Sequence, residues 1–303
     1  GLEQVGTAPD GRPIFEELST DGRDQGDDFL LTNVDGDSGS QTTVSLALSK
    51  THDFGLDWTF GYAYNKAEDV NPMTSSVSFS NYTNLATANA QNPGVSTSNY
   101  EIPHRFTFKA NYTKEFFDGY ETVVTLFGTR NKGRPFSYTM SDGPFGDIAY
   151  QGRSLLYVPT GLDDPNFAVG TDGDGNPFET GAFFDFLEES GLSKYAGGIA
   201  PRNEFNSKWW TKVDLRVEQE LPGFMDGHKA SAFFVIENLG NMLNDDWGVL
   251  YEARFPRAIN IADVEINDAG QYQFNNFRDV SNVQSRQGEP SLWSVRIGVE
   301  YKF

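Results

Sequence analysis

Three oxygen-bearing side chains alternate with glycine in one short stretch of the chain. Asp172, Asp174 and Asn176 have the spacing of the first ligands in a calcium-binding loop. An EF-hand also needs glycine at the sixth position and glutamate at the twelfth, where this chain has Pro177 and Phe183. We therefore expect either a looser surface site for a structural calcium ion or a solvated turn of Asp, Gly and Asn residues.

The remaining reactive side chains offer little further chemistry. The three histidines, His52, His104 and His228, lie far apart and show none of the spacings of a zinc or iron site. The sequence contains no cysteine, so these 303 residues can form no disulfide and supply no thiolate ligand or thiol nucleophile. It also contains no nucleophile elbow, phosphate-binding loop or dinucleotide fingerprint. We expect no enzyme, no cofactor, and solvated turn positions for His52 and His228.

The charge and hydropathy of the chain restrict the class of protein. Its 303 residues include 43 acidic and 23 basic side chains, a net charge of −20, which argues against a nucleic-acid partner because phosphates require a basic face. The longest apolar runs are only a few residues, as at 232–236, whereas a spanning helix needs roughly 18 to 20. If the chain crosses a bilayer, it must do so as strands.

A period-two alternation of apolar and polar residues recurs along the chain and predicts strands with one apolar face. In the first of them, Val44 and Leu46 share one face, while Thr43 and Ser45 share the other. Six further segments repeat the pattern, and an eighth strand is less clearly indicated near 29–33. The seven predicted strands are 43–50, 56–65, 104–113, 121–130, 209–219, 229–238 and 291–303.

The connections between these strands alternate between short and long. Short turns are expected at 51–55, 115–120 and 221–228, and long connections at 66–103, 138–208 and 240–290. Segments 1–40, 138–208 and 240–290 hold 29 acidic and 10 basic residues, so the acidity lies mainly outside the strands. Short periplasmic turns and long extracellular loops are typical of outer-membrane barrels. We predict an all-β fold, an antiparallel transmembrane β-barrel segment of about seven or eight strands.

The C-terminal strand has the most regular alternation. A terminal phenylalanine, with aromatic residues at both ends of the strand, is typical of the signal by which outer-membrane barrels are recognised for assembly. The aromatic residues would lie at the membrane interfaces, and the aliphatic residues between them would face lipid. The residues on this face are Trp293, Val295, Ile297, Val299, Tyr301 and Phe303.

Several stretches together resemble the C-terminal part of Oar-like TonB-dependent receptors, which are outer-membrane transporters with a plugged barrel. They are NPMTSS at 71–76, YEIPHR at 100–105, GRPFSY at 133–138, APRN at 200–203, VDLR at 213–216 and ENLGNMLNDDWG at 237–248. With 293–303 they span most of residues 28–303. Each stretch alone is weak evidence, but their order and spacing together are specific.

The resemblance implies more than this sequence contains. Family members have a TonB box, a plug domain and a barrel of about 22 strands. By that comparison, residues 1–303 are the C-terminal portion of the barrel, and the plug and TonB box are absent from them. The implied function is energised uptake of an unidentified substrate across the outer membrane of a Gram-negative bacterium. The implied partners are the lipid bilayer, the barrel assembly machinery, the TonB complex through an N-terminal part, and the transported ligand.

Charged residues alternate with apolar ones on the predicted strands. A basic side chain in lipid costs about 2 to 4 kcal/mol at the bilayer midplane, so we expect these charges to face the lumen. They are Arg105, Lys109, Lys212, Asp214, Arg216, Glu218, Arg296, Glu300 and Lys302. One interpretation is a cross-strand ladder of ion pairs that supports a wet interior. The other is a wall against which the plug domain docks.

Three other interpretations of the sequence remain open. It could be a complete eight-stranded barrel, since eight is the lower limit for such barrels. It could be a non-transporting surface or adhesion barrel whose acidic loops bind calcium or a partner, or a soluble secreted β-protein. In each case we expect the aromatic residues of the long connections to pack the loops more than to bind a sugar or peptide. These residues are Phe183, Phe184, Phe186, Tyr251, Phe274 and Phe277.

Overall fold

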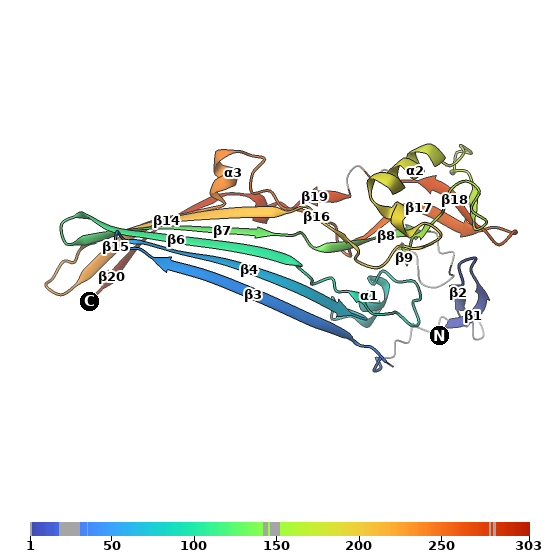
Figure 1. Cartoon of the computed structure of the whole chain (residues 1–303), viewed down its shortest axis with the longest axis horizontal. Helices are drawn as coiled ribbons and strands as arrows, with labels where there is room; N and C mark the ends of the chain where they lie inside the picture. The colour runs from blue at the N-terminus through green and yellow to red at the C-terminus, as the bar shows by residue number, and fades with distance from the viewer. Residues whose placement is uncertain are drawn as a thin grey trace.

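The computed structural model describes residues 2–17, 31–34, 36–141, 145, 152–278, 280 and 283–303. It is dominated by antiparallel β-sheet, which confirms the predicted all-β class. No helix in these described ranges is long and apolar enough to span a membrane. The molecule has two regions, a sheet of long strands and a smaller domain at one end of it (Figure 1).

Seven long strands form the first region, which we call the long-stranded sheet. Each pairs antiparallel with its neighbours in the order β20-β15-β14-β7-β6-β4-β3, and the short β5 (Ser96–Thr97) pairs with the end of β4. All seven predicted strands are confirmed. Their bounds are β3 (Gly39–Thr51), β4 (Leu56–Asp69), β6 (His104–Phe117), β7 (Tyr120–Asn131), β14 (Trp210–Pro222), β15 (Lys229–Glu237) and β20 (Ser294–Lys302).

The long-stranded sheet is open. Strands β3 and β20 are its two edges and do not pair with each other, so the described residues form no closed barrel. The predicted eighth strand near 29–33 is not observed where it can be assessed: residues 31–33 are not in a strand, and residues 29 and 30 lie outside the described ranges. The alternative of a complete eight-stranded barrel is therefore not what the described residues form.

The connections separate to the two ends of the long strands, as the alternation of loop lengths predicts. The turns at 52–55, 118–119 and 223–228 join β3 to β4, β6 to β7 and β14 to β15 at one end. The C-terminus lies at this end, which we call the turn side (Figure 1). The N-terminal hairpin and the described residues among 66–103, 138–208 and 251–286 lie at the other end, the loop side, whereas residues 238–248 lie over the long strands (Figure 1).

The long connections fold into a domain of their own, which sequence periodicity did not predict. We call the described residues among 135–206 and 251–286 the loop domain. Its main sheet has the order β11-β18-β17-β8-β13, with β9 paired to β8, and it is mixed, because β17 is parallel to β8 and β11 is parallel to β18. Its elements are β8 (Pro135–Ser141), β9 (Ser154–Leu155), β11 (Phe167–Val169), α2 (Thr180–Glu189), β13 (Phe205–Asn206), β17 (Ala258–Ile266) and β18 (Tyr272–Phe277).

Short elements complete the chain. Strands β1 and β2 form a hairpin beside the loop domain, β10 pairs with β12, and β16 pairs with β19. These strands are β1 (Leu2–Thr7), β2 (Pro13–Glu17), β10 (Tyr157–Val158), β12 (Gly198–Ile199), β16 (Tyr251–Ala253) and β19 (Gln284–Arg286). The short helices are α1 (Ser78–Thr83), η1 (Leu192–Tyr195), α3 (Leu239–Leu243) and η2 (Glu289–Ser291).

The hydrophobic core lies outside the seven long strands. Phe183 of α2 and Phe274 of β18 are fully buried, with their ring centroids 5.3 Å apart, and Phe178 lies within 5.6 Å of both rings. Phe184, Phe186 and Phe277 pack against the same cluster. The prediction that the loop aromatic residues pack the loops is thus confirmed for these phenylalanines. Tyr251 is not part of the cluster and lies beneath the Lys208 ammonium group, at 5.0 Å.

Candidate functional site

One face of the long-stranded sheet is apolar across all seven strands. The strand register places apolar side chains directly opposite one another, as in the row Tyr112, Val124, Val217, Phe234 and Ile297. These side chains are accessible, with exposed fractions between 37 and 82 % for the largest contributors. Those contributors are Val44, Leu46, Leu48, Phe60, Phe108, Phe234, Val295, Ile297 and Val299. An apolar surface of this extent is suited to a non-aqueous environment or a partner.

The predicted assembly signal belongs to this apolar face. Val295, Ile297 and Val299 pair with Ile236, Phe234 and Ala232 of β15, and Tyr301 pairs with Ala230. Trp293 precedes the strand and is 48 % exposed, and Phe303 follows it and is 97 % exposed. The common face of Val295, Ile297, Val299 and Tyr301 therefore agrees with the alternation, while the face of Trp293 and Phe303 and recognition by an assembly machinery stay predictions.

The opposite face carries the predicted charges. The register brings Arg105, Lys109, Lys212, Asp214, Arg216, Glu218, Arg296 and Glu300 to this side, opposite residues such as Thr125, Phe127 and Val235. The structure thus places these charges on one face, which we call the polar face.

The ion pairs on the polar face run mainly along the strands, which differs from the predicted cross-strand ladder. Lys212 lies 3.4 Å from Asp214 and Arg216 lies 2.7 Å from Glu218, both between residues two apart on β14. Such residues share a face about 7 Å apart, within reach of long side chains. Lys302 and Glu300 pair in the same way on β20, at 3.3 Å, whereas Arg296 pairs across strands with Glu237 of β15.

The segment from Asn238 to Gly248, which includes α3, is fixed to β14 by two hydrogen bonds. The Trp210 indole N–H donates to the Gly248 carbonyl at 3.0 Å, and the Asn238 backbone N–H donates to an Asp214 carboxylate oxygen at 2.8 Å. Asn238 has a left-handed φ of 54°, and a Cβ at position 248 would lie 1.9 Å from the Asn238 Oδ1 atom. Glycine is therefore required at 248. Asp214, predicted only as a lumen charge, also positions this segment.

An aromatic cluster lies at the loop side of the apolar face. Tyr62 and Tyr64 of β4, His104 and Phe106 of β6, and Trp209 form neighbouring contacts with ring centroids 4.9 to 6.2 Å apart. The Tyr62 hydroxyl lies 3.0 Å from the His104 Nδ1 atom. We call these five residues the loop-side belt. The periodicity of β4 and β6 predicts their common face, but the contact of Trp209 depends on how β14 pairs in the sheet.

A second group of aromatic residues lies at the turn side. Its members are Phe54, Phe116, Phe117, Phe224, Tyr301 and Phe303, and we call them the turn-side belt. Phe224 stacks on Tyr301 with ring centroids 5.5 Å apart. The exposed fractions of the phenylalanines run from 60 to 97 %.

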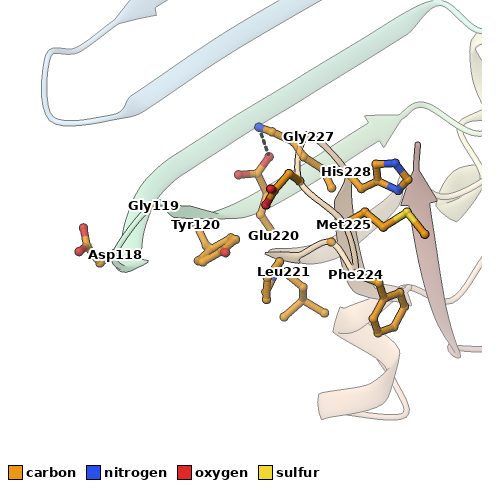
Figure 2. Close-up of a pocket in the computed structure, with 13 residues that line it drawn as sticks. Asp118, Gly119, Tyr120, Glu220, Leu221, Phe224, Met225, Gly227 and His228 are labelled. Carbon is orange, nitrogen blue, oxygen red and sulfur yellow. Dashed lines mark ion pairs between the residues drawn. The ribbon is translucent and has the colours of Figure 1, made fainter.

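An open hollow lies between two turns at this end. It has a volume of about 920 Å³ and is lined by residues 118–120 and 220–229 (Figure 2). His228 at its margin lies 2.9 Å from the Tyr301 hydroxyl, and His52 in the neighbouring turn accepts a hydrogen bond from the Trp58 indole at 3.3 Å. Both histidines occupy turns as predicted, but they are half-buried against aromatic residues rather than solvated.

The predicted calcium loop forms a turn closed by its own hydrogen bonds. One Asp172 oxygen accepts from the backbone N–H groups of Asp174 at 3.0 Å and Asn176 at 2.8 Å, and the other accepts from the Asn176 side chain at 2.9 Å. The Asn176 hydrogen bonds lower the pKa of Asp172. Among the described residues there is no group of three His, Cys, Asp or Glu side chains that could hold a metal ion. The calcium site stays a prediction.

Arg202 joins the loop domain to the long-stranded sheet. Its guanidinium group is 4 % exposed, donates to the Val70 carbonyl at 2.7 Å and lies 3.0 Å from an Asp69 carboxylate oxygen at the end of β4. Burial lowers its pKa, and the neighbouring Asp69 opposes that effect. The next residue, Asn203, is also buried and donates to the Thr97 carbonyl at 2.7 Å. The sequence marked these residues only as a family-like motif, because no local pattern indicates a buried arginine.

Asp164 organises the turn between β10 and β11. It is 4 % exposed and accepts hydrogen bonds from the Tyr157 hydroxyl at 3.0 Å, the Thr160 backbone N–H at 2.7 Å and the Asn166 backbone N–H at 2.8 Å. Burial alone would raise its pKa, but these hydrogen bonds hold it below the ordinary value. The role of Asp164 is therefore structural.

No family model matches the chain, and neither a curated protein nor a solved structure matches it. The case for a function therefore depends on the two faces, the two belts and the separation of turns from loops.

Proposed function

We propose that the chain is the C-terminal barrel portion of an outer-membrane TonB-dependent transporter, similar to the Oar-like receptors, with its apolar face in the lipid bilayer. The observation that carries this proposal is the continuous, exposed apolar face of seven strands, bounded at each end by aromatic residues. A soluble protein of this size rarely exposes such a large apolar surface to water. In a lipid bilayer the same side chains contact acyl chains, so their unfavourable hydration is avoided.

The distance between the belts supports a membrane location. On β14, Thr211 lies in the row of Tyr62 and Phe106, and Leu221 lies in the row of Tyr301. These positions are ten residues apart, or about 33 Å of strand. At the usual strand tilt this corresponds to about 25 Å along the bilayer normal, which is the height of the apolar band in outer-membrane barrels.

In this proposal the open edges of the sheet continue into further strands. Within the described residues, β3 and β20 each have one unpaired edge, and unpaired backbone groups are not stable in lipid. Strands of the same receptor on either side would complete the barrel and make the polar face the wall of its lumen. The plug would dock on the charges of that wall, and TonB would supply energy through the N-terminal part of the receptor.

The loop domain is the extracellular part in this proposal. It lies at the end of the sheet opposite the short turns, and it has a core of its own (Figure 1). A domain that folds independently of the bilayer can present a ligand-binding surface above the lumen. The acidic character of the long connections favours a ligand that is neutral or cationic.

Cysteine accessibility tests the membrane location. Since the chain has no cysteine, single substitutions report on one site each. We expect L46C and I297C on the apolar face to react at least about tenfold more slowly with a water-soluble thiol reagent than S45C on the polar face or G173C in the loop domain, because lipid suppresses thiolate formation. The measurement is made on outer membranes from cells that express the full receptor. Equal rates at all four positions would contradict the proposal.

A second measurement separates a transporter from an adhesion barrel. A transporter should cross-link to the periplasmic domain of TonB when the full receptor is purified with it. An adhesion barrel should insert in the membrane with the same cysteine pattern and give no TonB cross-link.

A further inference from the structure

At the loop side of the long-stranded sheet, Arg130 and Lys132 lie on the apolar face rather than on the polar face. Arg130 of β7 pairs with Phe106 of β6 and so shares its face, and Lys132 continues the same side two residues later. The backbone N–H of Lys132 donates to the His104 carbonyl at 2.9 Å, which keeps the end of β7 against β6. These cations stand at the loop-side belt.

Both cations contact the same ring. The Arg130 guanidinium carbon lies 5.4 Å and the Lys132 ammonium nitrogen 5.7 Å from the Trp209 ring centroid. Trp209 also contacts His104 and Phe106 at 6.2 Å and is itself 38 % exposed. Contact with the tryptophan ring restricts where the two flexible side chains can place their charge.

Neither cation has a carboxylate partner in the part of the chain that the structure describes. By contrast, Lys212 and Arg216 on the polar face each pair with an acidic residue two positions away. The chain has a net charge of −20, yet these two cations, two residues apart and over the same ring, have no acidic partner among the described residues. They leave a local positive charge that an anionic ligand can neutralise.

We propose that Arg130, Lys132 and Trp209 bind the phosphate of an anionic lipid headgroup. This inference rests on the proposed function, because it requires the apolar face to lie in a bilayer. The loop-side belt then lies at the boundary between the hydrocarbon and the headgroups, where lipid phosphates are found and aromatic residues accumulate. The two cations flank the phosphate, Trp209 lies between the phosphate and the hydrocarbon, and the acyl chains lie along the neighbouring apolar rows.

The test compares two double variants of equal charge. R130Q/K132Q removes the two unpaired cations at the loop side of the apolar face, and R105Q/K109Q removes two cations of the polar face that likewise form no ion pair within the described residues. The full receptor that contains this chain, called the parent chain below, is first tested for flotation with phosphatidylcholine vesicles that contain phosphatidylglycerol. In detergent micelles, native mass spectrometry then gives the concentration of phosphatidylglycerol or phosphatidylcholine that half-saturates a one-lipid adduct.

We expect the parent chain to float and to retain phosphatidylglycerol in preference to phosphatidylcholine. R130Q/K132Q should float equally well but need roughly 25-fold more phosphatidylglycerol, about fivefold for each cation. W209L should need about threefold more, because it keeps the apolar contact and loses the ring. R105Q/K109Q should behave as the parent chain, and the circular dichroism of all variants should match that of the parent.

Three results would overturn the inference, and they differ in what else they affect. If all variants float and retain phosphatidylglycerol equally, the lipid site is wrong and the proposed function stands. If inorganic phosphate at the same concentration displaces the lipid, the site recognises free phosphate rather than a headgroup. If the parent chain does not float, the proposed function fails and this inference fails with it.

Discussion

The loop domain buries its large apolar side chains, whereas the long-stranded sheet exposes them. Ile261 of β17 is completely buried, and Ile297 of β20 is 82 % exposed. Both residues lie within β-strands, so secondary structure does not explain the difference. The chain therefore contains two kinds of region. The loop domain is stabilised by its own core, whereas the apolar side chains of the long-stranded sheet need a non-aqueous environment or a partner to cover them.

Truncation of a phenylalanine should separate the two regions most strongly. F183A removes a fully buried ring from the core of the loop domain, and we expect it to reduce the free energy of unfolding of that domain by about 3 to 5 kcal/mol. The matched control is F108A, which truncates a ring that is 39 % exposed on the apolar face. It should change this free energy by less than about 0.5 kcal/mol.

The measurement is denaturant unfolding in detergent, followed by near-ultraviolet circular dichroism. If F108A destabilised the loop domain as much as F183A does, the stability of the loop domain would depend on the apolar face of the long-stranded sheet. The distinction between a self-stabilised domain and an exposed apolar sheet would then be wrong.

Removal of the arginine that joins the regions should have the next largest effect. R202A leaves the Asp69 carboxylate and the Val70 carbonyl without their buried partner, so we expect a loss of about 2 to 4 kcal/mol in the stability of the loop domain. K194A is the control, because it breaks an exposed ion pair with Glu204 and should cost no more than about 1 kcal/mol.

Limited proteolysis in detergent would report this effect. Cleavage should become faster within the loop domain of R202A, while the long strands keep their protection. Equal acceleration in both regions would show that Arg202 stabilises the whole molecule rather than the junction.

Acid should weaken the loop domain through Asp164. Its pKa is lower in the folded than in the unfolded chain, so its stabilisation is fully present above the ordinary value near 3.8 and is lost as pH falls through the lowered folded pKa. D164N should cost about 1 to 3 kcal/mol at neutral pH, and this difference should shrink at low pH. The neighbouring exposed residue provides the control D163N, which should leave the curve of stability against pH unchanged. A parallel acid curve for D164N and the parent chain would contradict this assignment.

Local periodicity was sufficient to predict the long-stranded sheet. Seven strands, their two faces and the separation of short turns from long connections follow from alternation alone, because a strand with one apolar face must repeat every second residue. Arg130 falls on the apolar side of its strand, but Lys50 and Lys114 do so as well. The alternation alone therefore did not single out the proposed lipid site.

The loop domain was not predictable in the same way. Its strands are short, and its phenylalanines at 167, 178, 183 and 274 come from separate segments that meet only in the folded chain. Arg202 and Asp164 likewise depend on partners brought together by the fold, and the calcium-like spacing at 172–176 did not reveal that Asp172 would use its oxygens within its own turn.

By itself, the sequence determined which residues form long strands, which side of each strand is apolar, and that the chain contains no sulfur chemistry. Three features emerge only from the folded chain. The long connections form a domain with its own core, the long-stranded sheet is open at β3 and β20 within the described residues, and Trp209 contacts Arg130 and Lys132. These features differ from the alternation in the sequence separation of the residues that interact. Alternation reflects the geometry of neighbouring residues, whereas a core, a sheet edge and a cation over a ring depend on which distant segments pair.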